Sequence, residues 1–403
     1  MTEAPYRPTN ARYRPETGCA ASAGRRGDLL AASAPPAERW LLIECRDAWP
    51  RDALTALHRS DPPSVEEEPT SERASAEGKP TSEPASADET PTSEPASARG
   101  DSAAAEGLRG VRRAGGVGAD DIGAQVARLC AAMGCRPVLI RRYGRHDRNA
   151  PRRWAFVDSR PGQESIRWGE LPGDEHLLDV LTGKDQGTPS TEPVYLVCTH
   201  GRHDACCAVW GRPAAAALAA AYPDRTWECS HVGGDRFAPN VVLLPHSLFY
   251  GHVPPSRVAE LATRYEDGLI VLEFFRGSGA FPPHVQAAQH FARAAGYSLA
   301  VDALRPIAIH QLAPNTWHVR LATHPQTQLP SHAATGRRDR ASGVLASPTA
   351  SVPPDQAANQ ASVDVITVEV AAHLVTIDGA MTCASKAPGR VRQFTLISQI
   401  HAA

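Results

Sequence analysis

The chain has little excess charge of either sign, and it lacks a long apolar run. Of its 403 residues, 42 are Lys or Arg and 44 are Asp or Glu, which gives a formal net charge of −2. This balance argues against broad binding to nucleic acid or to an anionic membrane, because both depend on clustered positive charge. No apolar segment approaches the roughly 20 residues that a membrane-spanning helix needs. The composition therefore predicts a soluble globular protein with neither nucleic acid nor membrane as a partner.

The sequence also lacks the signs of an exported protein. The N-terminal MTEAPYRPTNARYRPETG has basic residues but no apolar core after them, so no signal peptide is expected. The nine cysteines are odd in number, which fits reduced thiols better than a disulfide framework. Both observations predict a cytoplasmic location, where thiols stay reduced.

Two internal stretches lack the apolar residues that a packed core requires. The related units PTSERASA, PTSEPASA and PTSEPASA begin at positions 69, 80 and 91 and offer only Ala and Pro for burial. Residues 60–108 are therefore predicted to be a disordered acidic linker. Residues 324–361, rich in Pro, Ser, Ala and Gly, form a second linker-like insert. Residues 1–35 are expected to be a flexible N-terminus that is only partly ordered.

The remaining sequence alternates strand and helix patterns, which predicts an α/β fold. An N-terminal α/β half over 36–185 contains the first insert and has the order β, long connection, α, β, β, β, α. Residues 190–323 have the order β-α-β-β-β-α, which is that of a thioredoxin-like core. The N-terminal half is accordingly predicted to be a degenerate repeat of the second, as a tandem duplication would produce.

Two further expectations concern the second half and the end of the chain. The helix ACCAVWGRPAAAALAAAY is expected to be interrupted, or to begin afresh, near Pro213, because proline suits a first turn and not a helix interior. Residues 362–403 alternate apolar and polar positions, so they are predicted to form antiparallel strands that complete a sheet edge.

A sparse set of thiols and one imidazole follows two strands of the second half. Cys198 ends the strand PVYLVCTH, and Cys206 and Cys207 open the next helix. Ligands of βα units are held outside the carboxyl end of the strand, and a helix N-terminus favours the thiolate, which is the form that binds metal. His231 follows the next strand, in the Gly-rich turn HVGGD, with Asp235 four residues on. The loops after two neighbouring strands are therefore predicted to converge on one site.

The other cysteines and histidines have plainer interpretations. Because adjacent helix positions point in different directions, at most one of Cys206 and Cys207 is expected to act beside Cys198. Asp235 has a structural alternative, as a capping residue or a partner of Arg236. Free cysteines are often small buried apolar residues, which is the expectation for Cys45, Cys130, Cys135 and Cys383. Surface or capping roles are expected for His200, His203, His246 and His252.

The segments CTHGRHDACCAVWGRP and SHVGGDRFAPNVVLLPHSLFYGHV, with WLLIECRDAWPRDAL near the N-terminus, resemble the sucrase/ferredoxin-like family. The resemblance covers most of the chain outside the two inserts. It implies a thioredoxin-like [2Fe–2S] ferredoxin whose cluster is held by two cysteines and two histidines, with three residues between the histidines.

Carried over residue by residue, the resemblance implies Cys198 and Cys207 as the cysteines and His231 as the first histidine. The second histidine falls on Asp235, where this sequence departs from the family pattern. An aspartate is a hard oxygen ligand, so the fourth ligand stays open between Asp235, Cys206, Cys229 and His203.

The predicted function is that of a [2Fe–2S] electron carrier or redox protein with an unknown redox partner protein. The alternatives are a zinc-binding structural module with the same ligands, a metal-free thiol redox protein, and a binding module without a cofactor. No pair of carboxylates is placed recognisably for glycoside chemistry, so the word sucrase in the family name has no counterpart among these residues.

Overall fold

The computed structural model describes residues 14–58, 121–144, 149–323, 364–385, 388–398 and 400–402. The two predicted inserts, 60–108 and 324–361, lie outside these residues. Among the residues that the structure describes, no helix is both long and apolar enough to cross a membrane.

A short helix, α1 (Cys19–Arg26), precedes the first strand and lies in the stretch expected to be partly ordered. The elements of the N-terminal half that follow are β1 (Arg39–Glu44), α2 (Ile122–Ala132), β2 (Cys135–Arg141), β3 (Arg153–Asp158), β4 (Ser165–Glu170), α3 (His176–Leu181) and β5 (Thr188–Ser190). Helix α2 begins where the Asp121 side chain accepts a hydrogen bond from the amide of Ala124. It ends before Gly134, which has a positive φ of 61° that glycine adopts without strain.

The second half repeats this order of strands and helices. Its elements are β6 (Val194–Cys198), α4 (Ala205–Ala221), β7 (Thr226–Cys229), β8 (Val241–Leu244), β9 (Leu248–Tyr250), α5 (Val258–Glu266) and β10 (Phe275–Ser278). Strands β8 and β9 form an antiparallel hairpin. Short 3-10 turns join some of these elements: Pro15–Thr17, Ala53–Ala56, Asp235–Phe237, Pro255–Arg257 and Leu272–Phe274.

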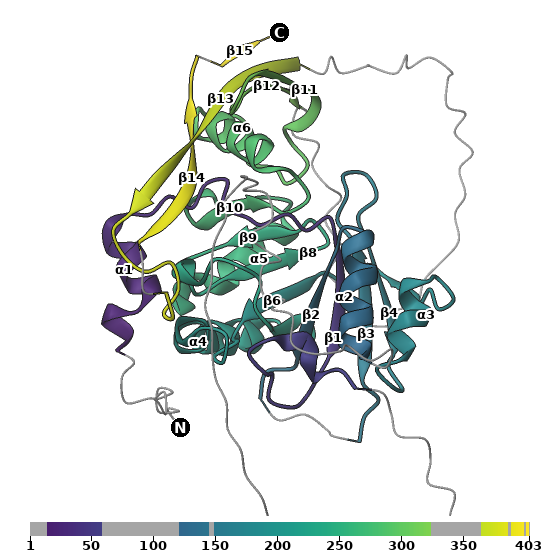
Figure 1. Ribbon diagram of the computed structural model, residues 1–403. Helices are drawn as coiled ribbons and strands as arrows, with labels where there is room; N and C mark the ends of the chain where they lie inside the picture. The colour runs from purple at the N-terminus through teal and green to yellow at the C-terminus, as the bar shows by residue number, and fades with distance from the viewer. Residues whose placement is uncertain are drawn as a thin grey trace, which may run out of the picture. The chain divides into compact units, whose positions relative to one another are not determined.

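One ten-stranded mixed sheet contains the strands of both halves, in the order β10-β9-β8-β6-β7-β2-β1-β3-β4-β5 (Figure 1). In each half the first strand is parallel to the second and antiparallel to the third. The halves meet where β2 runs antiparallel to β7, with Ile140 opposite Cys229. The α/β fold class is thus confirmed. The two halves have corresponding strand orders, β2-β1-β3-β4 in the first and β7-β6-β8-β9 in the second.

Alternate strand residues pack on opposite faces of this sheet, as the period of two dictates. Leu41 and Ile43 of β1 belong to the cluster that α2 and α3 complete. Trp40 and Leu42 belong to a different cluster, which also contains Leu196 and other residues of the second half. Each fully buried side chain of this size contributes about 2 kcal/mol. The second cluster therefore joins the two halves into one core, and it includes Cys198, Cys207 and Cys229.

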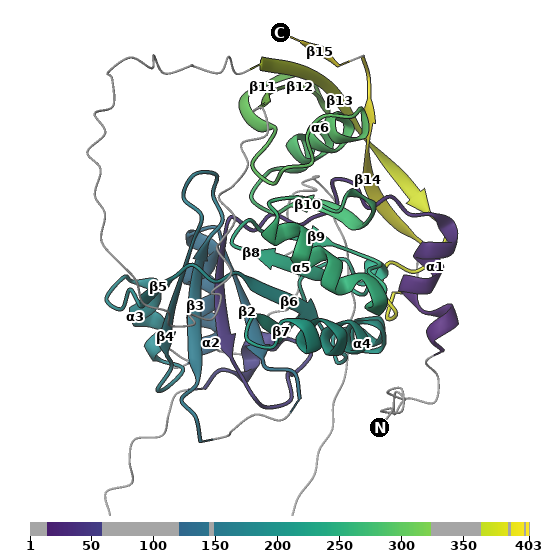
Figure 2. The same cartoon turned by 180° about the vertical axis from the view of Figure 1, so that it is seen from behind.

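A second, antiparallel sheet follows the first. Strands β11 (Arg305–Ala313), β12 (Thr316–Thr323), β13 (Asp364–Ile377) and β14 (Gly389–Leu396) pair in this order, and β15 (His401–Ala402) pairs with β13 (Figure 2). Helix α6 (Pro283–Ala294) packs on β12, β13 and β14. The C-terminal segment therefore forms strands, as predicted. Strand β13 pairs with β12, and β14 and β15 pair with β13, so these strands belong to the second sheet and do not extend the large one.

Helix α4 differs from the sequence expectation because it runs without a break through Pro213. A proline inside a helix removes one amide donor and crowds the preceding turn. Burial of Ala214, Ala215 and Leu218 in the second half's core compensates for this loss. The helix therefore stays continuous from the thiols at its start to Ala221.

Candidate metal centre

The end of β6 and the start of α4 are held in close contact. A Cβ added to Gly211 of α4 would lie 2.0 Å from the carbonyl oxygen of Cys198, so only a glycine fits at this position. The carboxylate of Asp204 accepts a hydrogen bond of 2.8 Å from the amide of Cys206 and so caps the helix. Together these contacts place Cys207, on the first turn of α4, against Cys198.

The donor atoms of Cys198, Cys207 and His231 lie within 4.8 Å of one another, and both cysteines are buried. Cys229 lies opposite Cys198 in the parallel pairing of β6 with β7, and its thiol forms a hydrogen bond with that of Cys198. The sequence predicted that Cys198, Cys207 and His231 would converge, and the structure brings these three residues together.

Asp235 lies at the same site and contacts both kinds of donor. Its Oδ1 is 2.9 Å from Nδ1 of His231 and accepts a hydrogen bond of 3.3 Å from the Cys207 thiol. This contact is an ion pair when His231 is protonated. The Asp235 side chain is only 4 % exposed. The carboxylate therefore lies beneath the imidazole and the thiol.

His203 is a further imidazole at this site. Its ring stacks on that of His231 with centroids 3.7 Å apart, and its Nε2 is 3.7 Å from Oδ2 of Asp235. Donor atoms of His203, His231 and Asp235 also fall within 4.8 Å of one another. His203 is therefore not the plain surface or capping residue that was expected, although 30 % of its side chain is exposed. His200, by contrast, is buried and bonded through Nε2 to the carbonyl of Pro50 at 2.7 Å.

The turn that carries His231 is fixed by glycines and by one buried arginine. Gly233 and Gly234 have φ values of 92° and 86°, which L side chains rarely adopt. The guanidinium of Arg276 donates to the carbonyl of Gly233 at 2.9 Å and to Oδ1 of Asn240 at 2.7 Å. A Cβ on Gly234 would lie 2.5 Å from that guanidinium. The paired glycines therefore let Arg276 approach the backbone and hold the turn in place.

The electrostatics of the site favour a thiolate next to a cationic imidazole. Hydrogen bonds with Cys207 and Cys229 lower the pKa of the Cys198 thiol well below its ordinary value, and His231 adds to this effect. Burial opposes the positive charge on His231, but Asp235 and Cys198 outweigh it and raise the pKa of His231 to about 9. The hydrogen bond with Cys198, together with burial, raises the pKa of the Cys207 thiol. The lowered pKa of Cys198 therefore favours its thiolate form, which is the form that binds metal.

A family model described as sucrase/ferredoxin-like matches residues 30–277, which is more than half of the chain. The chain belongs to the sucrase/ferredoxin-like family. Searches among curated proteins and among solved structures found no match. The family segment contains Cys198, Cys207, His231 and Asp235, and also His203.

The donor set of this sucrase/ferredoxin-like chain suits a metal that accepts sulfur and nitrogen. Thiolates and imidazoles select zinc or iron–sulfur clusters, whereas magnesium and calcium prefer oxygen donors. Two buried thiols and one imidazole place their donor atoms within 4.8 Å of one another, as the ligands of one metal site require. The residues present therefore fit a metal centre with sulfur and nitrogen ligands.

Cys206 lies in a different group from the one around Cys198. Its donor atom is within 4.8 Å of those of Cys19, Asp204 and Cys383. Cys383, which was expected to be a buried apolar residue, is exposed, whereas Cys45, Cys130 and Cys135 are buried as expected. Sequence reasoning missed Cys19 and Asp204. The position of Asp204 directly before the helix was a capping signal, but no local pattern pointed to Cys19.

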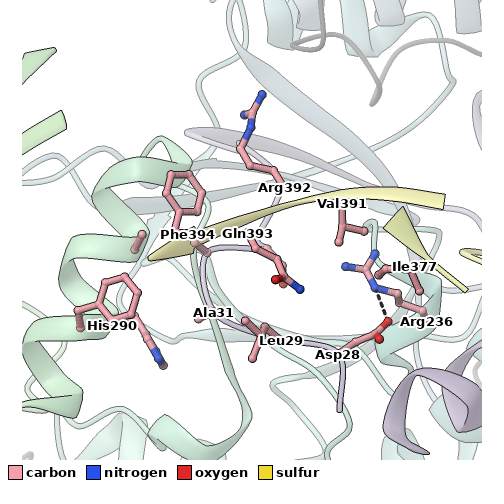
Figure 3. Close-up of a pocket in the computed structure, with 14 residues that line it drawn as sticks. Asp28, Leu29, Ala31, Arg236, His290, Ile377, Val391, Arg392, Gln393 and Phe394 are labelled. Atoms are coloured by element: carbon pink, nitrogen blue, oxygen red, sulfur yellow. Dashed lines mark ion pairs between the residues drawn. The ribbon is translucent and has the colours of Figure 1, made fainter. Parts of the chain in front are cut away.

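A cavity of about 140 Å³ lies apart from both groups of thiols (Figure 3). It is lined by residues 28–33, by α6 and by the strands β13 and β14. Arg236, the residue after Asp235, reaches this cavity and forms an ion pair of 3.2 Å with Asp28. The Asp235 alternative of pairing with Arg236 is thus not what the structure shows, because Arg236 pairs with Asp28 and Asp235 contacts His231.

Proposed function

We propose that the chain is a [2Fe–2S] electron-transfer protein whose cluster is bound by Cys198, Cys207, His231 and His203. The observation that carries this proposal is the convergence of two buried thiols with two stacked imidazoles at the ends of β6 and β7. Membership of a family described as ferredoxin-like supports the choice of cluster. The topology of the second half supports the thioredoxin-like form of the fold.

His203 is proposed as the fourth ligand in preference to Asp235. An imidazole matches iron bridged by sulfide better than a carboxylate does. Asp235 lies beneath His231, 2.9 Å from its Nδ1, which is where an orienting carboxylate is found behind a metal-bound histidine. Asp235 would then hold the orientation of the His231 ring, and His203 would be the fourth ligand.

When bound, such a cluster supplies transfer of one electron, and imidazole ligands raise its reduction potential above that of all-cysteine clusters. The buried residues of the site would exclude water from the cluster, and one edge of the site would remain exposed to solvent. Cys198, Cys207 and Asp235 are buried, whereas His203 is 30 % exposed. A redox partner protein would therefore dock over His203, and that imidazole would exchange protons with solvent.

The test is the metal content of the full chain purified without oxygen. We expect a brown protein with two iron and two sulfide per chain, as the formula of the cluster requires. Cys198→Ser and Cys207→Ser should lose the colour, whereas Cys130→Ser, on the buried face of α2, should keep it. A colour that survives loss of both cysteines would refute the ligand assignment.

The choice between His203 and Asp235 needs its own pair of variants. His203→Ala should abolish or strongly weaken binding of the cluster, because it removes a proposed ligand. Asp235→Asn should retain a cluster and only weaken binding, by the roughly 10- to 100-fold that loss of an outer-shell partner costs. The reverse ranking would make Asp235 the fourth ligand.

A zinc site is the second candidate function, because Asp235 contacts both Cys207 and His231. Cys198, Cys207, His231 and Asp235 offer two sulfurs, one nitrogen and one oxygen, all of which are donors that zinc accepts. Zinc in place of iron, at one equivalent that disappears in Cys198→Ser, would support this reading and reject the cluster.

A further inference from the structure

A second group of metal-binding side chains joins three segments that are distant in the sequence. It consists of Cys19 on α1, Asp204 and Cys206 at the start of α4, and Cys383 in the loop between β13 and β14. One donor atom from each lies within 4.8 Å of the others. Figure 1 shows α1 in purple beside the yellow loop that follows β13, and the contacts below join both to α4. We call these four residues the outer thiol group.

The spacing of the outer thiol group is that of ligands around one ion. The Cys383 sulfur lies 3.4 Å from that of Cys206 and 3.6 Å from that of Cys19. The Cys19 sulfur lies 3.7 Å from Oδ1 of Asp204. Zn–S bonds of about 2.3 Å place neighbouring sulfurs of a tetrahedral site roughly 3.8 Å apart, whereas a disulfide requires about 2.0 Å. The three distances are therefore close to those between neighbouring ligands of a tetrahedral zinc site, and the two between sulfurs are too long for a disulfide.

Backbone amides already orient the donors of this group. Oδ1 of Asp204 accepts from the amide of Cys206 at 2.8 Å, and Oδ2 accepts from the amide of Cys383 at 2.6 Å. Each carboxylate oxygen keeps a second lone pair for a metal. The amide of Ala20 donates to the Cys206 sulfur at 3.5 Å. Amide donors of this kind are the outer-shell support that thiolate and carboxylate ligands have in metal sites.

The outer thiol group lies apart from the proposed cluster and partly outside the family segment. Cys206 and Cys207 are adjacent on α4, where successive side chains point about 100° apart, so each serves a different group. Cys19 and Cys383 fall outside the matched residues 30–277. The membership of the family therefore does not account for Cys19 and Cys383.

We propose that Cys19, Cys206, Cys383 and Asp204 bind one Zn²⁺ ion. Three sulfurs and one oxygen form a closed tetrahedral set without an open position, which is typical of a structural zinc site and not of a catalytic one. The ion ties α1 and the β13–β14 loop to the start of α4. Helix α1 has 8 residues, too few for a stable isolated helix, so it depends on such tertiary contacts.

The test is zinc analysis of the full chain, purified without oxygen, together with variants of the exposed ligand. We expect one zinc per chain in addition to any iron. Because Cys383 is exposed, Cys383→Ser should fold normally, as far-ultraviolet circular dichroism will show, yet lose the zinc. Cys45→Ser is the matched control and should keep it. Iron at Cys198 and Cys207 is measured in the same samples, so failure of one site is distinguished from failure of the other.

Cobalt gives a second readout that does not depend on activity. Co²⁺ added to the metal-free chain should produce a thiolate-to-cobalt charge-transfer band and the visible bands of a tetrahedral ion. In Cys198→Ser these bands should persist. In Cys383→Ser the affinity for Co²⁺ should fall by more than the roughly 10- to 100-fold that loss of an outer-shell partner costs.

Three results would overturn the proposal. One is a chain that contains no zinc and gives no tetrahedral cobalt spectrum. Another is zinc that is retained in Cys383→Ser and lost in Cys198→Ser. The third is a disulfide between two of the three cysteines in protein purified without oxygen, detected by mass spectrometry of unreduced peptides.

Discussion

At the scale of single residues, the adjacent Cys206 and Cys207 belong to two different groups of metal-binding side chains. Both are buried on the first turn of α4, yet Cys207 contacts Asp235 and Cys206 contacts Cys383. The sequence predicted that only one of the pair would join Cys198, because adjacent helical side chains diverge. It could not predict the partner of Cys206, since Cys383 is 177 residues away and its position depends on the second sheet.

A cluster bound through His231 should have a potential that depends on pH. Protonation of a ligating imidazole adds positive charge and stabilises the reduced state, so the potential should fall as the pH rises. The limit is about 59 mV per pH unit for one proton per electron. Potentiometry from about pH 6 to 9 covers the imidazole range. A flat profile for a chain with a confirmed cluster would contradict histidine ligation.

Arg276 should be among the residues on which stability depends most. It is almost fully buried, and burial lowers the pKa of its guanidinium to about 9, yet it binds the carbonyl of Gly233, Asn240 and Ser33. Arg276→Met would leave these acceptors without donors and should cost about 3 kcal/mol in the free energy of unfolding. Urea unfolding measures this loss.

The control for that variant is Arg264→Met, whose side chain is 45 % exposed and pairs with Asp267 at 3.9 Å. A change at such a surface position should stay within about 0.5 kcal/mol. If the two variants were equally stable, the buried guanidinium would not support the HVGGD turn.

At the scale of elements, the closeness of α4 to β6 creates the site. The strands and helices of both halves could be predicted from periodicity, because apolar residues at alternate positions and caps such as Asp121 are local signals. Continuity of α4 through Pro213 could not, because it depends on the burial of Ala214 and Leu218 against other elements. The stacking of His203 on His231 could not be predicted for the same reason, because it depends on how the loop after β6 and the turn after β7 pack together.

Gly211→Ala tests the contact between α4 and β6. The added Cβ would meet the carbonyl oxygen of Cys198 at 2.0 Å, so the helix must move away from the strand. We expect a loss of about 1–3 kcal/mol, as for other overpacked cores, and loss of metal from the Cys198–Cys207 site. Thermal unfolding and iron analysis measure the two effects.

Gly24→Ala is the matched control, because Gly24 also lies in a helix but has no atom within 4 Å of the added Cβ. It should stabilise the protein by about 0.5–1 kcal/mol, through the better helix propensity of alanine. Equal effects of the two substitutions would show that propensity, and not the contact with Cys198, governs position 211.

At the scale of the whole molecule, the two halves of the sheet share one core. Trp40 and Ile140 of the first half belong to the same buried cluster as Trp227 and Val242 of the second. The sequence predicted two similar halves but not how they join, because the antiparallel pairing of β2 with β7 leaves no local signal. The C-terminal strands could be predicted from the alternation of apolar and polar residues, as the other strands could. The pairing of β13 with β12 could not be predicted in this way.

A shared core predicts that both halves of the sheet unfold together. Trp154 packs among first-half residues and Trp227 in the shared cluster, so each reports on a different part of the sheet. Fluorescence of variants that retain only one of these reporters should give coincident denaturant transitions, as a two-state process requires. Separated midpoints would mean that the halves are independent units.

The 3.6 Å contact between Cys19 and Cys383 spans 364 positions of the chain. A cross-link between these two residues would lower the conformational entropy of the unfolded chain, because it would close almost the whole polypeptide into a ring. The chain-entropy treatment of cross-links gives about 6 kcal/mol for closing a loop of this length. With zinc in place of a covalent bond, that gain would be reversible, so a chelator or a fall in free zinc would open the ring without breaking any bond of the backbone.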